Sequence, residues 1–169
     1  MADVAARIAG LWGRLATLPP TARRQLAEVR DRLRAAALHM DPNPPEMAET
    51  RLLAAPAAAP FPTRVYAPDG AGRNGPGLLF FHGGGFLVGG LESHDGLCRR
   101  LAAASGVRVV SVAYRLAPEH RYPAQREDAR TALAWLVDNA GRLEIDAFNR
   151  TCPFNAWLGI RVVAASDVG

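Results

Sequence analysis

The chain has 169 residues, of which 49% are hydrophobic, and a formal net charge of +4. This length allows one domain with a real core, and the composition is globular rather than disordered or fibrous. All 20 basic residues are arginine, and they alternate with acidic residues, as in EVRDRLR (28–34), instead of forming a basic block interleaved with aromatic residues. The pattern therefore favours solvated helix faces and no nucleic-acid partner.

The sequence gives little indication of a metal site, a disulfide scaffold or a membrane-spanning segment. The two cysteines, Cys98 and Cys152, are too few for a metal site of their own or for a disulfide scaffold. No apolar run approaches the ~20 residues that cross a bilayer. Arg7 and Arg14 interrupt any signal-peptide core at the amino terminus. We therefore expect a cytoplasmic protein without a membrane span.

Two amphipathic helices are predicted at the start of the chain. Apolar residues recur at helical spacing over residues 4–15, and LPP (18–20) ends that pattern because proline cannot continue a helix. A second apolar stripe covers residues 26–37, and DPNPP (41–45) closes it. Sequence alone favours helices that pack on a core over helices that cover a site.

From about Thr50 the apolar pattern becomes that of strands. RLLAAP (51–56) and TRVYAP (63–68) are short pieces bounded by proline, typical of antiparallel strands at a sheet edge. GLLFFH (77–82) and VRVVSVAY (107–114) are continuous apolar runs, which predict strands buried on both faces.

Helices are expected between and after these strands. One is predicted around Leu97 to Ser105 and another over 125–140, while GIRVVAAS (159–166) is a candidate for a third buried strand. Strands that alternate with helices predict an α/β fold, with a mostly parallel sheet covered by helices on both faces.

The stretch HGGGF (82–86) directly follows the first buried strand, where parallel sheets carry their functional loops. A phosphate-binding loop would need a lysine, which the chain lacks, and Val88 stands where the dinucleotide fingerprint requires its last glycine. Two interpretations remain. One is an oxyanion hole, in which main-chain N–H groups stabilise a negative oxygen, and the other is a tight turn without a ligand. Three consecutive glycines exceed what a turn needs and favour the oxyanion hole.

HGGGF, taken together with YRLAPEHRYPAQREDARTALAWL (114–136), resembles the hormone-sensitive-lipase-like family of α/β-hydrolase esterases and lipases. The resemblance covers roughly residues 45–146. It implies a truncated α/β-hydrolase fold, with a lid-like helical segment over 1–45, half of the core over 46–146 and a divergent tail over 147–169. It also implies a small acyl-ester substrate and no metal or organic cofactor.

The resemblance implies roles for the residues of the glycine loop. Gly84 and Gly85 would be the main oxyanion donors, and Gly83 would complete and shape the oxyanion hole. His82 would orient the loop rather than act as the catalytic base, and an ordinary histidine at a strand end is the alternative.

Outside the loop, Arg115, Glu119 and Asp128 would form a scaffold that holds the turn and the following helix together by hydrogen bonds and ion pairs. His94 and His120 lie in predicted loops without a partner pattern, and we expect them to be exposed to solvent.

A complete Ser-Asp-His triad is not found in the sequence. Esterases of this kind carry Gly-x-Ser-x-Gly followed by an acid and a histidine. The weak candidate Ser166 is flanked by Ala164 and Val168 instead of glycines, and only three residues follow it. Cys152 is interpreted as an ordinary loop cysteine.

The resemblance ends abruptly after LEIDA (143–147), which suggests a frameshift or disruption in an esterase gene. We expect the chain alone to be inactive and its exposed sheet edge to favour self-association. A non-catalytic module that binds a hydrophobic or acyl ligand, and a fragment without function, remain as alternatives.

Overall fold

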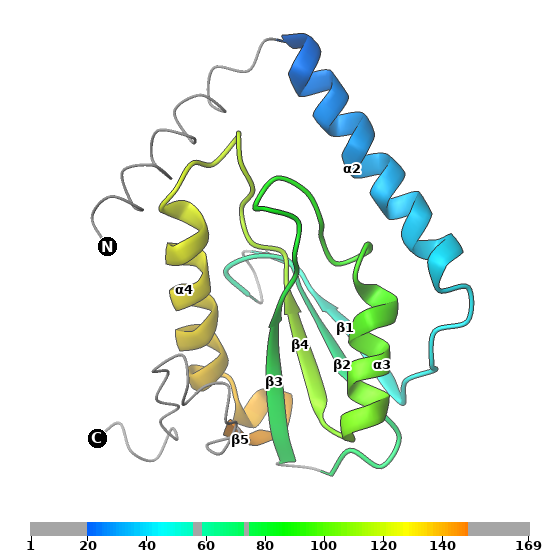
Figure 1. Ribbon diagram of the computed structural model, residues 1–169. Helices are drawn as coiled ribbons and strands as arrows, with labels where there is room; N and C mark the ends of the chain where they lie inside the picture. The colour runs from blue at the N-terminus through cyan, green and yellow to red at the C-terminus, as the bar shows by residue number, and fades with distance from the viewer. Residues whose placement is uncertain (1–19, 56–58, 73–74, 149–169) are drawn as a thin grey trace, which may run out of the picture.

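The computed structural model describes residues 20–55, 59–72 and 75–148, which form a sheet flanked by helices (Figure 1). The helix predicted over 4–15, the strand predicted over 159–166, and the candidates Cys152 and Ser166 lie outside the described residues. The predicted α/β fold is confirmed in the part that is described.

The elements alternate between strands and helices after an initial helix. In chain order they are α2 (Pro20–Met40), β1 (Glu49–Leu53), β2 (Thr63–Ala67), β3 (Gly75–Phe81), α3 (Asp95–Ser105), β4 (Arg108–Val112), α4 (Ala124–Asp138), the 3-10 turn η1 (Gly141–Leu143) and β5 (Ile145–Phe148). The five strands form one sheet in the order β1-β2-β4-β3-β5. The β1–β2 and β2–β4 pairs are antiparallel, whereas β3 pairs in parallel with both β4 and β5. The predicted antiparallel start at one edge of the sheet is thus confirmed.

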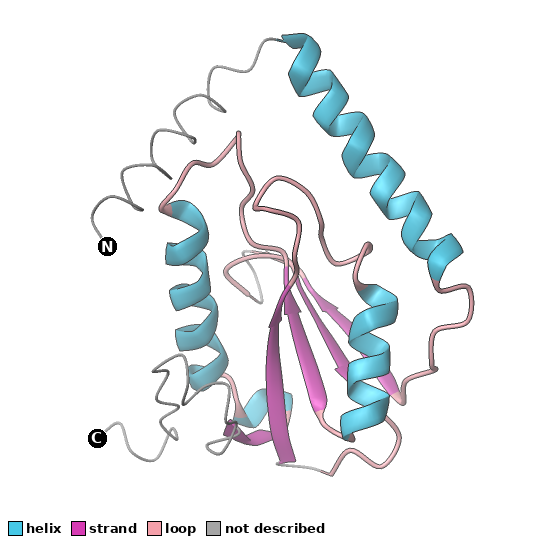
Figure 2. Ribbon diagram, viewed as in Figure 1, coloured by secondary structure: helices cyan, strands magenta, loops and turns pink. Residues whose placement is uncertain are grey.

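Consecutive residues of the central strand β4 pack into the cores on opposite faces of the sheet. Val109 packs with Cys98 and Ala102 of α3, whereas Val110 packs with Leu136 of α4 on the other face. Successive side chains of a strand point to opposite faces, so helices are needed on both sides. Figure 2 shows α3 and α4 on opposite sides of the strands. Every residue of β4 is buried, as predicted.

Strand β3 is less buried than predicted. Leu78 and Leu79 are half-buried, and Phe81 keeps 38% of its surface exposed. On one edge, β4 pairs with β3 as far as Phe81, but on the other edge β5 pairs only with Gly75–Gly77. The prediction that β3 is buried on both faces is therefore wrong, because an apolar run does not specify which neighbours will cover it.

Strand β5 was not predicted from the sequence, where only a divergent tail was expected from residue 147. Its first residue, Ile145, is 2% exposed and packs with Leu136 and Leu143. The short turn η1 returns the chain from α4 to the sheet, and this return places Ile145 beneath the helix.

Helix α2 stands outside the sheet, alongside the loop that follows β3 (Figure 1). It ends at Met40, just before the Asp41–Pro42 pair, because the residue before a proline is disfavoured in helical conformation. Within the described ranges, no helix is both long and apolar enough to cross a membrane.

Candidate functional site

The HGGGF loop leaves the carboxyl end of β3 and turns back sharply on itself. Gly84 has φ of 126°, and a Cβ placed on it would lie 2.1 Å from the carbonyl oxygen of Val88. Gly89 has φ of 99°, and its Cβ would lie 2.4 Å from Nδ1 of His82. Side chains are excluded at both positions by conformation and by space. The loop therefore needs these glycines for its shape, independently of any ligand.

Hydrogen bonds within the loop engage its carbonyl groups. The oxygen of Gly84 accepts from the N–H groups of Leu87 and Val88, both at 3.1 Å. Nδ1 of His82 lies 2.8 Å from the oxygen of Gly83. Since a carbonyl only accepts, we assign the proton of the neutral ring to Nδ1. These bonds fix the peptide planes on both sides of Gly84.

The N–H groups of Gly84 and Gly85 are available to a ligand. Among the described residues they have no hydrogen-bond acceptor, and both glycines are exposed. Exposed main-chain N–H groups donate to water or to a bound oxygen, which is what an oxyanion donor must do. The arrangement is compatible with the predicted oxyanion role of residues 83–85, which stays a prediction.

The two sequence motifs meet in space at this loop. The hydroxyl of Tyr114 donates to the carbonyl oxygen of His82 at 2.6 Å, and the two rings stack with centroids 4.4 Å apart. The N–H of Ala117 donates to the carbonyl oxygen of Phe86 at 2.8 Å. The segment after β4 therefore braces the loop after β3 at both of its ends.

Sequence reasoning missed the role of Tyr114, although a signal was present. Phe81 pairs with Val112 in the parallel register, so residues that follow the two strands must lie side by side. A tyrosine two positions beyond Val112 was therefore a candidate to contact the glycine loop. Burial raises the pKa of Tyr114, which keeps its hydroxyl protonated as a donor.

His82 is buried and neutral. Burial lowers its pKa, and the nearby His94 lowers it further, against the opposing effect of the hydrogen bond to Gly83. The ring of His94 lies 5.4 Å from that of His82, and Nδ1 of His94 lies 2.9 Å from the hydroxyl of Ser93. The prediction of an exposed His94 is wrong, because this ring is half-buried beside His82. His120 is exposed, as predicted.

The predicted scaffold residues divide into two groups. Asp128 is 3% exposed and accepts from Nη2 of Arg115 at 2.7 Å and from the Arg115 backbone N–H at 2.8 Å. Gln125 adds a bond to the Arg115 carbonyl at 3.0 Å. The turn is thereby fastened to α4. Glu119 instead forms its ion pair with Arg30 of α2, at 2.8 Å.

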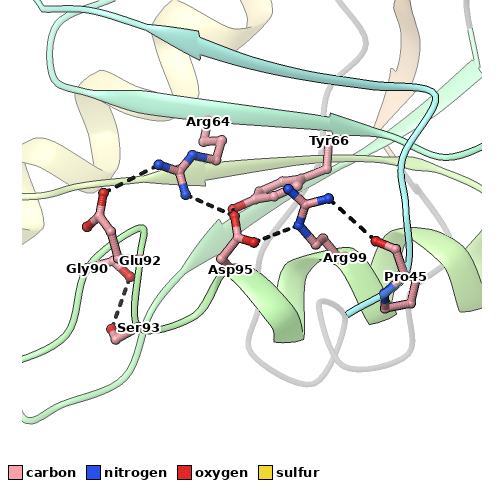
Figure 3. Close-up of polar contacts among 8 residues, drawn as sticks. All are labelled: Pro45, Arg64, Tyr66, Gly90, Glu92, Ser93, Asp95 and Arg99. Atoms are coloured by element: carbon pink, nitrogen blue, oxygen red, sulfur yellow. Dashed lines mark hydrogen bonds and ion pairs between the residues drawn. The ribbon is translucent and has the colours of Figure 1, made fainter. Parts of the chain in front are cut away.

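A second polar cluster holds the start of α3 against the sheet (Figure 3). Asp95 accepts from the hydroxyl of Tyr66 at 2.8 Å, from Nη1 of Arg64 at 2.9 Å and from Nε of Arg99 at 2.6 Å. Burial opposes the ionisation of Asp95, but the bonds from Arg99, Tyr66 and Arg64 outweigh it and hold its pKa below the ordinary value. Sequence reasoning missed this cluster, whose members come from two separate elements.

The residues around the Asp95 cluster also bond to the chain on either side of them. Arg64 bonds to Glu92 at 3.3 Å, and the hydroxyl of Ser93 donates to the carbonyl of Gly90 at 3.2 Å (Figure 3). Arg99 reaches the carbonyl of Pro45 at 3.4 Å. The segment between the glycine loop and α3 is therefore tied to β2 through Glu92.

In the described part of the chain, no three His, Cys, Asp or Glu side chains gather to hold a metal ion.

A mixed sheet with helices on both faces, and a glycine loop at the end of its first parallel strand, are features of the α/β-hydrolase fold. Comparison with known proteins agrees, since residues 78–152 match a family described as having the alpha/beta hydrolase fold. The described residues form part of this fold, and the chain is similar to hormone-sensitive-lipase-like carboxylesterases over part of their length.

Curated relatives of the chain are esterases. It is 49% identical over 89 residues to an ethyl acetate hydrolase of Pseudomonas putida, a match that covers 52% of this chain and 28% of that protein. It is 44% identical over 122 residues to esterase LipI of Mycobacterium tuberculosis, covering 70% and 37% of the two chains. The chain thus spans about a third of the length of these relatives.

Solved structures show the same partial overlap. An ester hydrolase from the metagenome of Lake Arreo, complexed with a bipyridine phosphonate derivative, is 38% identical with a TM-score of 0.65, covering 79% of this chain and 41% of that one. An esterase of Pyrobaculum calidifontis is 38% identical with a TM-score of 0.63, covering 76% and 46%.

Proposed function

We propose that this chain supplies the oxyanion-binding part of a carboxylic-ester hydrolase. The N–H groups of Gly84 and Gly85 carry the proposal, because both glycines are exposed and these N–H groups lack an acceptor among the described residues, while neighbouring carbonyls are engaged. The relatives named above are esterases or ester hydrolases, and their names support the same chemistry. Gly83 would complete the oxyanion hole, and buried His82 would orient the loop.

In this reaction a nucleophile attacks the ester carbonyl, and the carbonyl oxygen becomes negatively charged in a tetrahedral intermediate. Collapse of the intermediate releases the alcohol and leaves an acyl-enzyme, which water then hydrolyses. Donors fixed in advance at the position of the negative oxygen stabilise the transition state, and one such donor contributes about 3–4 kcal/mol. The proposal assigns no nucleophile among the described residues. A small acyl ester is the proposed substrate class, and the cytoplasmic location stays a prediction.

The test uses a chimera in which the 89 aligned residues replace their counterparts in the Pseudomonas hydrolase. We expect Gly84→Ala to lower kcat on p-nitrophenyl butyrate roughly 100-fold with little change in KM, because the loop can no longer aim its donors. Gly90→Ala is the matched control, since Gly90 lies outside residues 83–85 and a Cβ there would meet only the Glu92 side chain, at 3.7 Å. Equal activity of the two variants would refute the oxyanion role of Gly84.

A further inference from the structure

One arginine of helix α2 connects three groups in two separate loops. Nε of Arg30 donates to the carbonyl oxygen of Leu87 at 2.8 Å, and Nη2 donates to the carbonyl oxygen of Ala117 at 2.8 Å. Nη1 and Nη2 also bond to the two carboxylate oxygens of Glu119, at 2.8 and 3.0 Å. Only 20% of the Arg30 side chain is exposed.

The two carbonyls belong to the segments that meet at the glycine loop. Leu87 directly follows HGGGF, and its own N–H donates to the oxygen of Gly84. Ala117 donates its N–H to the oxygen of Phe86 and offers its carbonyl to Arg30. Arg30 therefore closes a ring of hydrogen bonds that runs through Leu87, Phe86 and Ala117.

An arginine suits this place because its guanidinium is planar and carries five donors in a rigid fork. It can bind a carboxylate in bidentate fashion and still reach carbonyls, whereas a lysine ammonium acts as a point charge. The pairing with Glu119 fixes the plane of the Arg30 guanidinium, so that Nε and Nη2 face the two loops.

We infer that Arg30 is a positioning residue for the glycine loop. By holding the Leu87 and Ala117 carbonyls, it keeps the turn around Gly84 closed and aims the N–H groups of Gly84 and Gly85. Helix α2 then helps to hold the glycine loop in place, through Arg30. The catalytic meaning of this inference rests on the proposed function, but the positioning itself does not.

A neighbouring arginine on the same helix provides a matched control. Arg34 pairs with Asp31 at 3.1 Å, one turn away on α2, and 58% of its side chain is exposed. Arg30 and Arg34 share the helix, the charge and an acidic partner. They differ in that Arg30 reaches the two loops.

The experiment measures amide hydrogen exchange by NMR on the full 169-residue chain. The N–H groups of Leu87 and Val88 report closure of the loop, because both donate to the oxygen of Gly84. The N–H groups of Val110 and Val112 in buried β4 report the stability of the sheet. We expect Arg30→Lys to speed exchange at 87 and 88 roughly 10-fold, with no change in β4.

Arg34→Lys should leave both sets of exchange rates unchanged. Unchanged exchange at 87 and 88 in Arg30→Lys would overturn the inference, and so would equal acceleration in β4, which indicates a role in stability alone. If Arg30→Lys does not fold, Glu119→Gln replaces it, because Glu119 is 53% exposed and its loss loosens Arg30 without removing it. We expect this variant to speed exchange at 87 and 88 roughly threefold, and no acceleration would overturn the inference.

Exchange needs no ester, so the two proposals fail separately. An inactive chimera together with fast exchange in Arg30→Lys would refute the hydrolase proposal and leave the positioning role intact. The expected Gly84→Ala effect together with normal exchange in Arg30→Lys would refute the positioning role alone.

Discussion

At the scale of single residues, the site is built from main-chain groups and a few side chains that hold them. His82 is buried, its ring stacks on that of Tyr114, and its Nδ1 bonds to the carbonyl oxygen of its neighbour Gly83. Glu119 joins α2 rather than α4, because its carboxylate lies within 3.0 Å of both terminal nitrogens of Arg30. The loop is therefore braced from two directions.

Tyr114 offers a test of this bracing. Tyr114→Phe keeps the ring stacked on His82 but leaves a carbonyl oxygen without its 2.6 Å donor. We expect a loss of about 1–2 kcal/mol in the free energy of unfolding, measured by urea denaturation, since a buried acceptor is left unsatisfied. Tyr122→Phe serves as the control, because this side chain is 49% exposed. Similar losses in the two variants would show that the hydroxyl of Tyr114 has no special role.

At the scale of elements, sequence periodicity located the described helices and most strands. It placed helices near α2, α3 and α4 and strands near β1 to β4, because the spacing of apolar residues is set within each segment. It failed for the burial of β3 and for the existence of β5. Both depend on which strand lies next to β3, and no local pattern carries that information.

The attachment of α3 to the sheet depends on the charge of Asp95. Because the folded-state pKa of this carboxyl is lowered, its contribution to stability is present above its unfolded pKa of about 3.9 and is lost as pH falls toward the folded value. We expect Asp95→Asn to cost about 2 kcal/mol at pH 7, from three hydrogen bonds weakened together. The difference from wild type should shrink below about pH 4, as followed by urea unfolding at several pH values.

Asp31→Asn is the control for this measurement, because among the described residues Asp31 pairs only with Arg34, and both side chains are exposed. A difference between Asp95→Asn and wild type that stays constant down to pH 2 would show that the charge of Asp95 is not what holds α3.

At the scale of the whole molecule, the 169-residue chain pairs a formed glycine loop with a sequence that lacks Gly-x-Ser-x-Gly. We expect the purified chain to turn over p-nitrophenyl butyrate no faster than its Ser166→Ala variant, because a serine needs a base to remove its proton. Release of nitrophenolate is the measurement. Fast hydrolysis that Ser166→Ala abolishes would show that the chain holds its own nucleophile. Thermal stabilisation by the ester without turnover would indicate a module that binds acyl ligands.

The sequence by itself determined the α/β class, the resemblance to an esterase family, and the position of the glycine loop at a strand end. These follow from apolar spacing, from the conformations open to glycine, and from two contiguous motifs. Only the tertiary structure decided how the loop is held. Tyr114 lies 32 residues from His82 and Arg30 lies 57 residues from Leu87. Sheet register and the docking of α2 bring these partners together, and neither is encoded in a local pattern.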